Sequence, residues 1–301
     1  LVVEKMRQHG LPEPDAADKG TTQPPKAPSR NALQLIDNIH AAWIEGVLNT
    51  ALAQENTIDL SLDRAGNQGA NLVLHRREGI DRPIVTGQRL SRLFDAAERS
   101  LLILGAPGSG KTITLLQLLD ELLQQARQDT TVPIPLLFNL SSFGNYESKE
   151  KTNDLLEWLA EQAHDQYRIN RERTRTQLRQ GQFVLLLDGL DEVSGAGKQR
   201  ERCVAAINDF VRAHPCGLVV CSRIGDYEAL QNELAVNHAL VLQPLANVQI
   251  EAFIQQAGGE QATAMLAQVG QDWQLREVLR SPLLLNLYPP AFAELEKDFA
   301  G

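Results

Sequence analysis

The feature that most constrains the fold is a glycine-rich segment, GAPGSGKT at 105–112, which joins two stretches of different character. The apolar run LLIL precedes it, and ITLLQLLDELL follows it with leucines at helical spacing. A strand that turns directly into a helix needs a tight loop, and glycine supplies the unusual backbone angles of such a loop. The backbone N–H groups of the loop and of the first helical turn then face one point, where they can bind phosphate. We therefore predict a phosphate-binding loop at this position.

The segment matches the whole pattern G-x-x-x-x-G-K-[ST], in which each fixed position has a physical task. We expect Lys111 to reach the β and γ phosphates of a nucleotide and the Thr112 hydroxyl to ligate Mg²⁺. The alternative, a glycine-rich turn with an unrelated lysine, does not explain the strand before the segment and the helix after it. The predicted nucleotide-binding residues of the segment are Gly105, Ala106, Pro107, Gly108, Ser109, Gly110, Lys111, Thr112 and Ile113.

A second motif, FVLLLDGLDEV at 183–193, is an apolar strand that ends in a group of acidic residues. Asp188, at the end of the strand, is the predicted second ligand of Mg²⁺. We expect Glu192 to orient or deprotonate the attacking water, with Asp191 assisting the metal shell. An ordinary acidic loop is the alternative, and the phosphate loop upstream makes it the weaker interpretation.

Three further apolar runs, at 134–140, 218–222 and 239–243, are similar to the two strands already described. Continuous apolar runs of this length fit strands that are buried on both faces. Because helical stretches alternate with the runs, we predict an α/β fold: a P-loop NTPase with a five-stranded parallel sheet flanked by helices. A small helical subdomain is predicted to follow, over 247–257, 260–268, 272–280 and a helix that starts at Pro282.

Arg223 ends the apolar run LVVCSR at 218–223. Ligands of open α/β sheets lie beyond the carboxyl ends of the strands, so an arginine at this point can contact the γ-phosphate of ATP. We therefore expect Arg223 to take part in the reaction together with Lys111, Asp191 and Glu192. The alternative is an ordinary surface arginine.

The amino-terminal part begins with a stretch rich in proline and polar side chains, which predicts a flexible linker. Apolar residues then recur at helical spacing from 31 to about 53, and the glycine-containing stretch at 55–83 is predicted to be irregular. The helix at 31–53 either packs on the following domain or binds a partner, and we expect the former. The predicted division is a linker at 1–30, a helical leader at 31–80, an NTPase domain at 81–245 and a truncated helical subdomain at 246–301.

Composition bears mainly on the partners and the compartment. The formal net charge of -9 argues against nucleic acid as a partner, because a basic surface is expected there. The three cysteines have no C-x-x-C spacing, so neither a disulfide framework nor a zinc site is predicted. No apolar run reaches the roughly 18 residues that a membrane helix needs. We therefore expect a cytoplasmic protein with no membrane segment within this chain.

The combination of motifs resembles the NACHT family of STAND signalling NTPases. The small residue Gly189 after Asp188, followed by Asp191 and Glu192, is the family's distinguishing mark. Neither the Asn-Lys-x-Asp motif of GTPases nor the LSGGQ-type signature of ABC ATPases is present in the sequence. The segments that carry the resemblance are GAPGSGKT at 105–112, VLLLDGLDEV at 184–193, CSR at 221–223 and SPLLLNL at 281–287, and PIPLLFNLSSF at 133–143 and VVCSRIGDYEAL at 219–230 resemble the bacterial branch.

The resemblance implies a nucleotide-dependent switch with slow Mg²⁺-dependent ATP hydrolysis, serving bacterial defence or signal transduction. The ADP-bound form of the family is closed, and exchange to ATP permits homo-oligomerisation. Pro282 is expected near the adenine, and effector or sensor domains are expected outside this chain. An ordinary turnover ATPase and a non-hydrolysing nucleotide-binding adaptor are the alternatives.

One departure from the family concerns the residues after SPLLLNL. The family continues into a winged-helix domain, whereas this chain reads YPPAFAELEKDFAG. We predict that Pro289 and Pro290, directly after Tyr288, break the helix that relatives continue. We therefore expect the chain to be a fragment or a truncated gene product.

Overall fold

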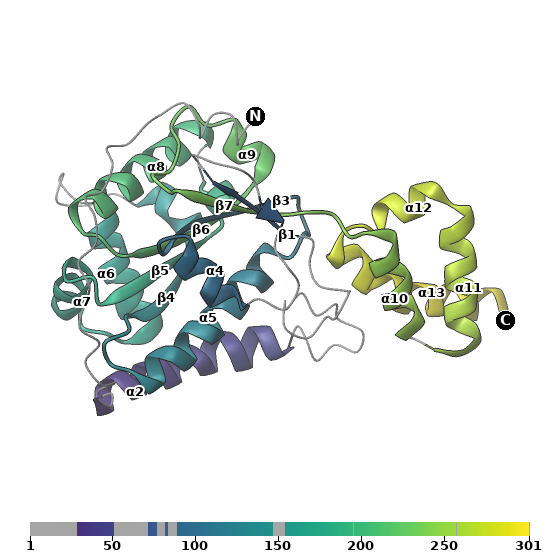
Figure 1. Cartoon of the computed structure of the whole chain (residues 1–301), viewed down its shortest axis with the longest axis horizontal. Coiled ribbons are helices and arrows are strands. Elements are labelled where there is room, and N and C mark those ends of the chain that lie inside the picture. The colour runs from purple at the N-terminus through teal and green to yellow at the C-terminus, as the bar shows by residue number, and fades with distance from the viewer. Residues whose placement is uncertain are drawn as a thin grey trace.

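The computed structural model describes residues 29–50, 72–76, 82–83, 89–146, 154–194, 196–256 and 258–300. In this part of the chain, seven strands form one sheet with the order β2-β1-β7-β3-β6-β5-β4. Figure 1 shows helices on both sides of this sheet and a separate group of helices beside it. The strands are β1 (Leu72–Arg76), β2 (Arg82–Pro83), β3 (Ser100–Gly105), β4 (Ile134–Asn139), β5 (Phe183–Asp188), β6 (Gly217–Arg223) and β7 (His238–Leu242).

The five predicted strands are present and parallel, in the order β7-β3-β6-β5-β4. Their apolar side chains are buried on both faces; Leu102, Leu185 and Val219, for example, are fully buried. The predicted α/β fold with a five-stranded parallel sheet is therefore confirmed.

Two strands were not predicted, because the stretch 55–83 was interpreted as irregular. Strand β1 pairs antiparallel with β7 along five residues, and β2 pairs with β1. The unpaired edge of β7 supplies the hydrogen bonds that this short, weakly patterned stretch cannot supply to itself. Pro83 lies in the outermost strand of the sheet, where a missing N–H costs little. The irregular interpretation was wrong for these two strands, and the rest of 55–83 lies outside the described residues.

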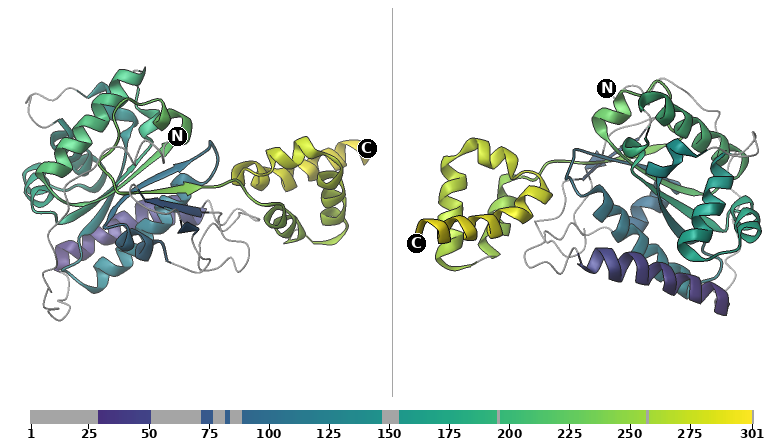
Figure 2. Two further views of the ribbon diagram at one scale, coloured as in Figure 1. Left: turned by 45° about the horizontal axis from the view of Figure 1, so that its top comes forward. Right: turned by 180° about the vertical axis from the view of Figure 1, so that it is seen from behind.

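The helices cover both faces of the sheet. Helix α5 begins at Lys111 and ends at Gln128, so the helix predicted after the glycine-rich loop is present. Figure 2 shows α5 and the leader helix on one side of the sheet and α8 on the other. The helices of this part are α4 (Leu90–Ala96), α5 (Lys111–Gln128), η3 (Leu140–Asn145), α6 (Asp154–Tyr167), α7 (Arg171–Arg179), η4 (Leu190–Glu192), α8 (Ala196–Ala213) and α9 (Ile224–Glu228).

The leader is helical, as the apolar spacing predicted, and it packs on the NTPase part. It consists of α2 (Arg30–Ile39) and a π-helical continuation, η1 (His40–Leu48). The side chains of Ile36 and Ile39 belong to the same hydrophobic core as the sheet. The indole N–H of Trp43 donates to the Tyr167 hydroxyl at 2.9 Å, which joins the leader to α6. Of the predicted linker at 1–30, residues 1–28 lie outside the described residues, whereas Ser29 caps α2 and Arg30 is its first residue.

Four helices follow the sheet and enclose a small hydrophobic core of their own. This core includes Phe253, Met265 and Leu285, and it is separate from the core around the sheet. The predicted helical subdomain after the sheet is therefore present. In the described part of the chain, no helix is both long enough and apolar enough to cross a membrane. The four helices are α10 (Asn247–Gln256), α11 (Gly259–Gln271), α12 (Trp273–Val278) and α13 (Pro282–Ala300).

The predicted helix break at Tyr288-Pro289-Pro290 was wrong, because α13 continues through both prolines. Packing on α11 offsets the hydrogen bonds that the two prolines remove. The Tyr288 hydroxyl donates to the side-chain carbonyl of Gln268 in α11 at 2.9 Å. The Tyr288 and Phe292 rings, one turn apart, meet edge to face at 5.9 Å. Proline inside a helix therefore carries a cost that tertiary contacts can exceed.

Candidate functional site

The candidate site lies at the carboxyl ends of three adjacent strands. Strand β6 lies between β3 and β5, so the chain brings three distant segments to one edge of the sheet. Gly105 at the end of β3 is paired in register with Arg223 at the end of β6. Asp188 ends β5, the next strand. The sheet therefore gathers the phosphate loop, the acidic motif and the predicted arginine.

The phosphate loop adopts the backbone conformation that its glycines predicted. Gly108 and Gly110 have φ angles of +71° and +92°, in the left-handed region that glycine adopts without a steric penalty. Gly110 immediately precedes α5, whose first residue is Lys111. The amino terminus of an 18-residue helix, with its partial positive charge, therefore points into the loop.

Lys111 lies across the loop that it follows. Its ammonium donates hydrogen bonds to the carbonyl oxygens of Gly105 and Ala106, each at 3.0 Å. Burial lowers the pKa of Lys111, and the negative charge of Asp191 acts in the opposite direction. Two carbonyl oxygens thus hold the ammonium where a phosphate could replace them as a stronger, charged acceptor.

Thr112 and Asp188 form a second contact between the loop and the acidic motif. The Thr112 hydroxyl donates to a carboxylate oxygen of Asp188 at 2.8 Å. Burial raises the pKa of Asp188, and the hydrogen bond from Thr112 partly opposes this effect. A hydroxyl beside a carboxylate is the kind of oxygen ligand set that Mg²⁺ prefers, so the two residues fit the predicted metal.

Asp191 is engaged by Arg223 through both of its carboxylate oxygens. The Nε of Arg223 lies 2.8 Å from one oxygen, and the backbone N–H of Arg223 donates to the other at 3.1 Å. The Asp191 side chain is 6% exposed, whereas that of Arg223 is 47% exposed. In the structure Asp191 therefore supports Arg223, and its predicted assistance to the metal shell stays a prediction.

Glu192 faces a residue that sequence reasoning missed. The side-chain N–H of Asn139 donates to a carboxylate oxygen of Glu192 at 3.4 Å. The amide oxygen of Asn139 accepts from the backbone N–H of Ser141 at 2.7 Å, which fixes the amide with its NH₂ group toward Glu192. The available signal was a polar residue at the end of an apolar run, the same signal that identified Asp188.

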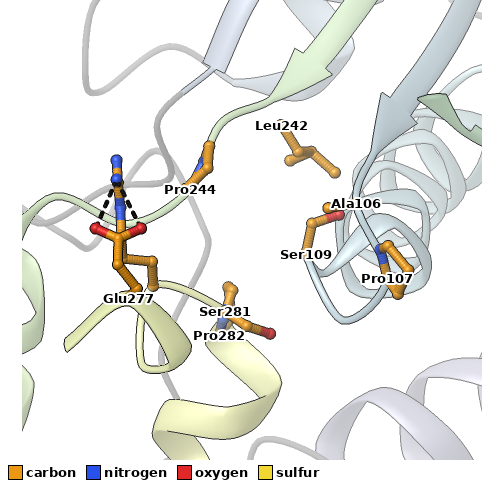
Figure 3. Close-up of a pocket in the computed structure, with 9 residues that line it drawn as sticks. Ala106, Pro107, Ser109, Leu242, Pro244, Glu277, Ser281 and Pro282 are labelled. Atoms are coloured by element: carbon orange, nitrogen blue, oxygen red, sulfur yellow. Dashed lines mark hydrogen bonds and ion pairs between the residues drawn. The ribbon is translucent and has the colours of Figure 1, made fainter. Parts of the chain in front are cut away.

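A cavity of about 200 Å³ lies between the phosphate loop and the helical subdomain. Figure 3 shows Ala106, Pro107 and Ser109 on one side of it and Ser281 and Pro282 on the other. Pro282 therefore lies across the cavity from the phosphate loop, and its expected place near the adenine stays a prediction. The remaining lining residues were not predicted, because they come together only through the path of the chain after β7: Leu242, Pro244, Glu277 and Arg280.

A family model and a solved structure are similar to this chain. The family model of the NACHT domain matches residues 99–261, which is more than half of the chain. No curated protein sequence matches the chain. Among solved structures, a Walker-type ATPase of Pyrococcus abyssi is similar, with 13% sequence identity and a TM-score of 0.42. That match covers 67% of this chain and 66% of the other.

Proposed function

The chain belongs to the NACHT domain family of nucleotide-binding NTPases, and from this premise we propose that it is an ATP- and ADP-binding switch with slow Mg²⁺-dependent ATP hydrolysis. The observation that carries the proposal is the convergence of Lys111, Asp188 and Arg223 at one edge of the sheet, beside the glycine-rich loop. A switch of this kind would act in bacterial signalling or defence. The bound nucleotide would change the conformation of the protein and permit a homo-oligomer to form. Effector or sensor domains outside this chain would respond to this change.

Phosphate binding is assigned to the loop at 105–112 and to Ile113. The ammonium of Lys111 would exchange the carbonyl oxygens of Gly105 and Ala106 for phosphate oxygens. Because burial lowers the pKa of Lys111, the apoprotein holds its charge less readily than an exposed lysine does. A bound phosphate would supply the negative charge that restores it.

Metal binding is assigned to Thr112 and Asp188. Bound Mg²⁺ would neutralise phosphate charge and help to orient the γ-phosphate. The hydrogen bond between the two residues keeps their oxygen atoms together before any ligand arrives. Asp188 must be ionised to serve as a ligand, and its raised pKa makes this step sensitive to acid.

Water activation is assigned to Glu192, with Asn139 as its partner. The hydrogen bond from the Asn139 side chain orients the Glu192 carboxylate, which could accept a proton from water. Glu192 is exposed to solvent at the site edge, so water can reach it. Asp191 supports Arg223, which we assign to the γ-phosphate of ATP.

The base is assigned to the cavity between the loop and the helical subdomain. Pro107, Leu242, Pro244 and Pro282 give this cavity apolar walls that suit the faces of a purine. Adenine is the proposed base, because the sequence has no guanine-binding motif. Pro282 would lie against the adenine.

Substitution of Lys111 by alanine tests the assignment directly. We expect Lys111→Ala to lose ATP and ADP binding and to keep its fold, because the ammonium contacts loop carbonyls and no core side chain. The measurement is titration with a fluorescent ATP analogue, together with thermal unfolding of the apoprotein. Lys198→Ala, which removes an exposed lysine on α8, is the matched control. Near-normal affinity in folded Lys111→Ala would contradict the proposal.

A further inference from the structure

The phosphate loop receives two hydrogen bonds from the helical subdomain. The Ser281 hydroxyl donates to the Gly108 carbonyl oxygen at 3.2 Å, and the backbone N–H of Leu283 donates to the same oxygen at 3.3 Å. The donors lie at the start of α13, more than 170 residues after the loop. A single carbonyl of the predicted nucleotide site is therefore held by a different structural unit.

Both polar groups of the Gly108–Ser109 peptide are engaged. Its carbonyl is held by Ser281 and Leu283, and its N–H, which belongs to Ser109, donates to the Ala106 carbonyl at 3.2 Å. A peptide group fixed at both ends cannot rotate freely, so these contacts define the orientation of the loop at its midpoint. The loop conformation thus depends partly on α13.

Gly108 is suited to this contact as well as to its own backbone angles. A Cβ atom at this position would lie 2.8 Å from the Ser281 hydroxyl oxygen and 3.1 Å from the Cβ of Leu283. Both distances are shorter than ordinary van der Waals contacts. The absence of a side chain at Gly108 therefore allows the start of α13 to approach the loop.

The support behind Ser281 is firm, because the turn before α13 is tied to the sheet. The Leu245 N–H donates to the Arg280 carbonyl at 2.9 Å, and the Arg280 Nε donates back to the Leu245 carbonyl at 3.2 Å. Leu245 follows β7, whose Leu242 is paired with Gly105 at the start of the phosphate loop. The contacts form a closed ring from β3 through the loop, α13 and β7 back to β3.

We propose that Ser281 is a positioning residue for the phosphate loop, through which the placement of the helical subdomain and the affinity for nucleotide phosphates control each other. The inference rests on the proposed function, because it assumes that the loop binds nucleotide. Coupling between two sites is reciprocal: whatever α13 contributes to phosphate affinity, bound phosphate contributes to the docking of α13. A substitution can remove the hydroxyl of Ser281, whereas the N–H of Leu283 belongs to the backbone and is kept in such a variant.

Paired substitutions at Ser281 test the link. Ser281→Ala removes the hydroxyl, and Ser281→Thr keeps it. A neutral hydrogen bond of this kind corresponds to about a two- to tenfold change in affinity, so we expect Ser281→Ala to bind ATP and ADP that much more weakly. Ser281→Thr should bind as the wild type does. Thr263→Ala is the matched control, because the Thr263 hydroxyl donates to a backbone carbonyl within α11 and does not touch the loop.

Amide hydrogen exchange supplies a second measurement that a merely structural role would not change. The Leu285 N–H bonds to the Ser281 carbonyl in the first turn of α13. In the wild type, saturating ADP should slow the exchange of this amide, and in Ser281→Ala the slowing should be reduced. Equal slowing in both proteins would overturn the proposal. So would wild-type affinity in Ser281→Ala, or an equal loss of affinity in Ser281→Thr.

The outcome separates this inference from the proposed function. If the wild type binds ATP and Lys111→Ala does not, the function stands, and the Ser281 variants then decide the inference alone. If the wild type binds neither ATP nor ADP, both fail together. Thermal unfolding of each apoprotein identifies a variant that has lost its fold, and exchange in the wild type with and without ADP then still tests the link.

Discussion

Replacement of Arg223 by alanine should shift the preference of the site between ATP and ADP. The guanidinium lies at the end of β6, next to Gly105 at the start of the phosphate loop. From there it can meet the γ-phosphate of ATP, which ADP lacks. A hydrogen bond between charged groups contributes about 1.5–3 kcal/mol. Because the Arg223 side chain is 47% exposed, solvent screening favours the lower figure, which corresponds to about a tenfold change in the ATP/ADP preference.

The same substitution should also destabilise the apoprotein. Asp191, with 6% of its side chain exposed, would lose the Nε contact and keep the Arg223 backbone N–H. A nearly buried carboxylate that loses such a partner costs about 1–3 kcal/mol in the free energy of unfolding. Arg212→Ala, which breaks a surface ion pair with Asp209, should change stability by less than about 1 kcal/mol and serves as the control.

Two measurements decide whether this reasoning holds. Calorimetric titration of wild type and Arg223→Ala with both nucleotides gives the ATP/ADP preference, and urea unfolding gives the stability. Asp191→Ala and the double variant complete a cycle, in which the double variant should cost less than the sum of the single ones. An equal loss of affinity for ATP and ADP would refute the assignment of Arg223 to the γ-phosphate. Additive stability changes would refute the pairing with Asp191.

Three further predictions concern the acidic motif and the base. Asp188→Asn should weaken Mg²⁺-dependent ATP binding, measured by titration with and without Mg²⁺; unchanged dependence on Mg²⁺ would exclude Asp188 as a ligand. Because burial raises the pKa of Asp188, its carboxyl stabilises the fold while protonated, and this contribution is lost as pH rises through the raised pKa. In urea unfolding of the apoprotein, the stability of Asp188→Asn relative to wild type should therefore increase with pH. Glu192→Gln should spare ATP binding and slow hydrolysis by about 100-fold or more, and hydrolysis at the wild-type rate would remove Glu192 as the base. ATP should protect against thermal unfolding more than GTP does, and equal protection would contradict the preference for adenine.

The parts of the fold that sequence predicted best are those with local physical causes. Helix α5 begins at Lys111, where the glycine loop ends, and buried apolar residues recur along it as far as Ala126, close to its last residue, Gln128. The five parallel strands follow from apolar runs that only a sheet buried on both faces can accommodate. The predictions that failed depended on distant partners: β1 is a strand because β7 has a free edge, and α13 passes Pro289 and Pro290 because α11 packs against it.

The site shows the same division between local and distant causes. The sequence could predict the positions of Lys111, Thr112 and Asp188, because the glycine-rich motif fixes the first two and the end of a strand fixes the third. Asn139 and Ser281 could not, since the first acts on Glu192 from a neighbouring strand and the second acts on Gly108 from another structural unit. Their roles depend on which strand ends are adjacent and on where the chain returns after β7.

The acidic motif places three negative charges close together, and residues of neighbouring elements compensate for their repulsion. Three carboxylates within five residues repel one another, and the charges of Glu192 and Asp191 add to burial in raising the pKa of Asp188. Each carboxylate has a donor from a different element: Thr112 of α5 for Asp188, Arg223 of β6 for Asp191, and Asn139 of β4 for Glu192. The three donors hold three like charges apart in fixed directions. A nucleotide adds further negative charge to this edge of the sheet. Of the three donors, Arg223 is cationic, and the adjacent Lys111 is a second cationic side chain. A divalent cation between Thr112 and Asp188 would supply the missing positive charge, which is why we expect phosphate affinity at this site to depend strongly on Mg²⁺.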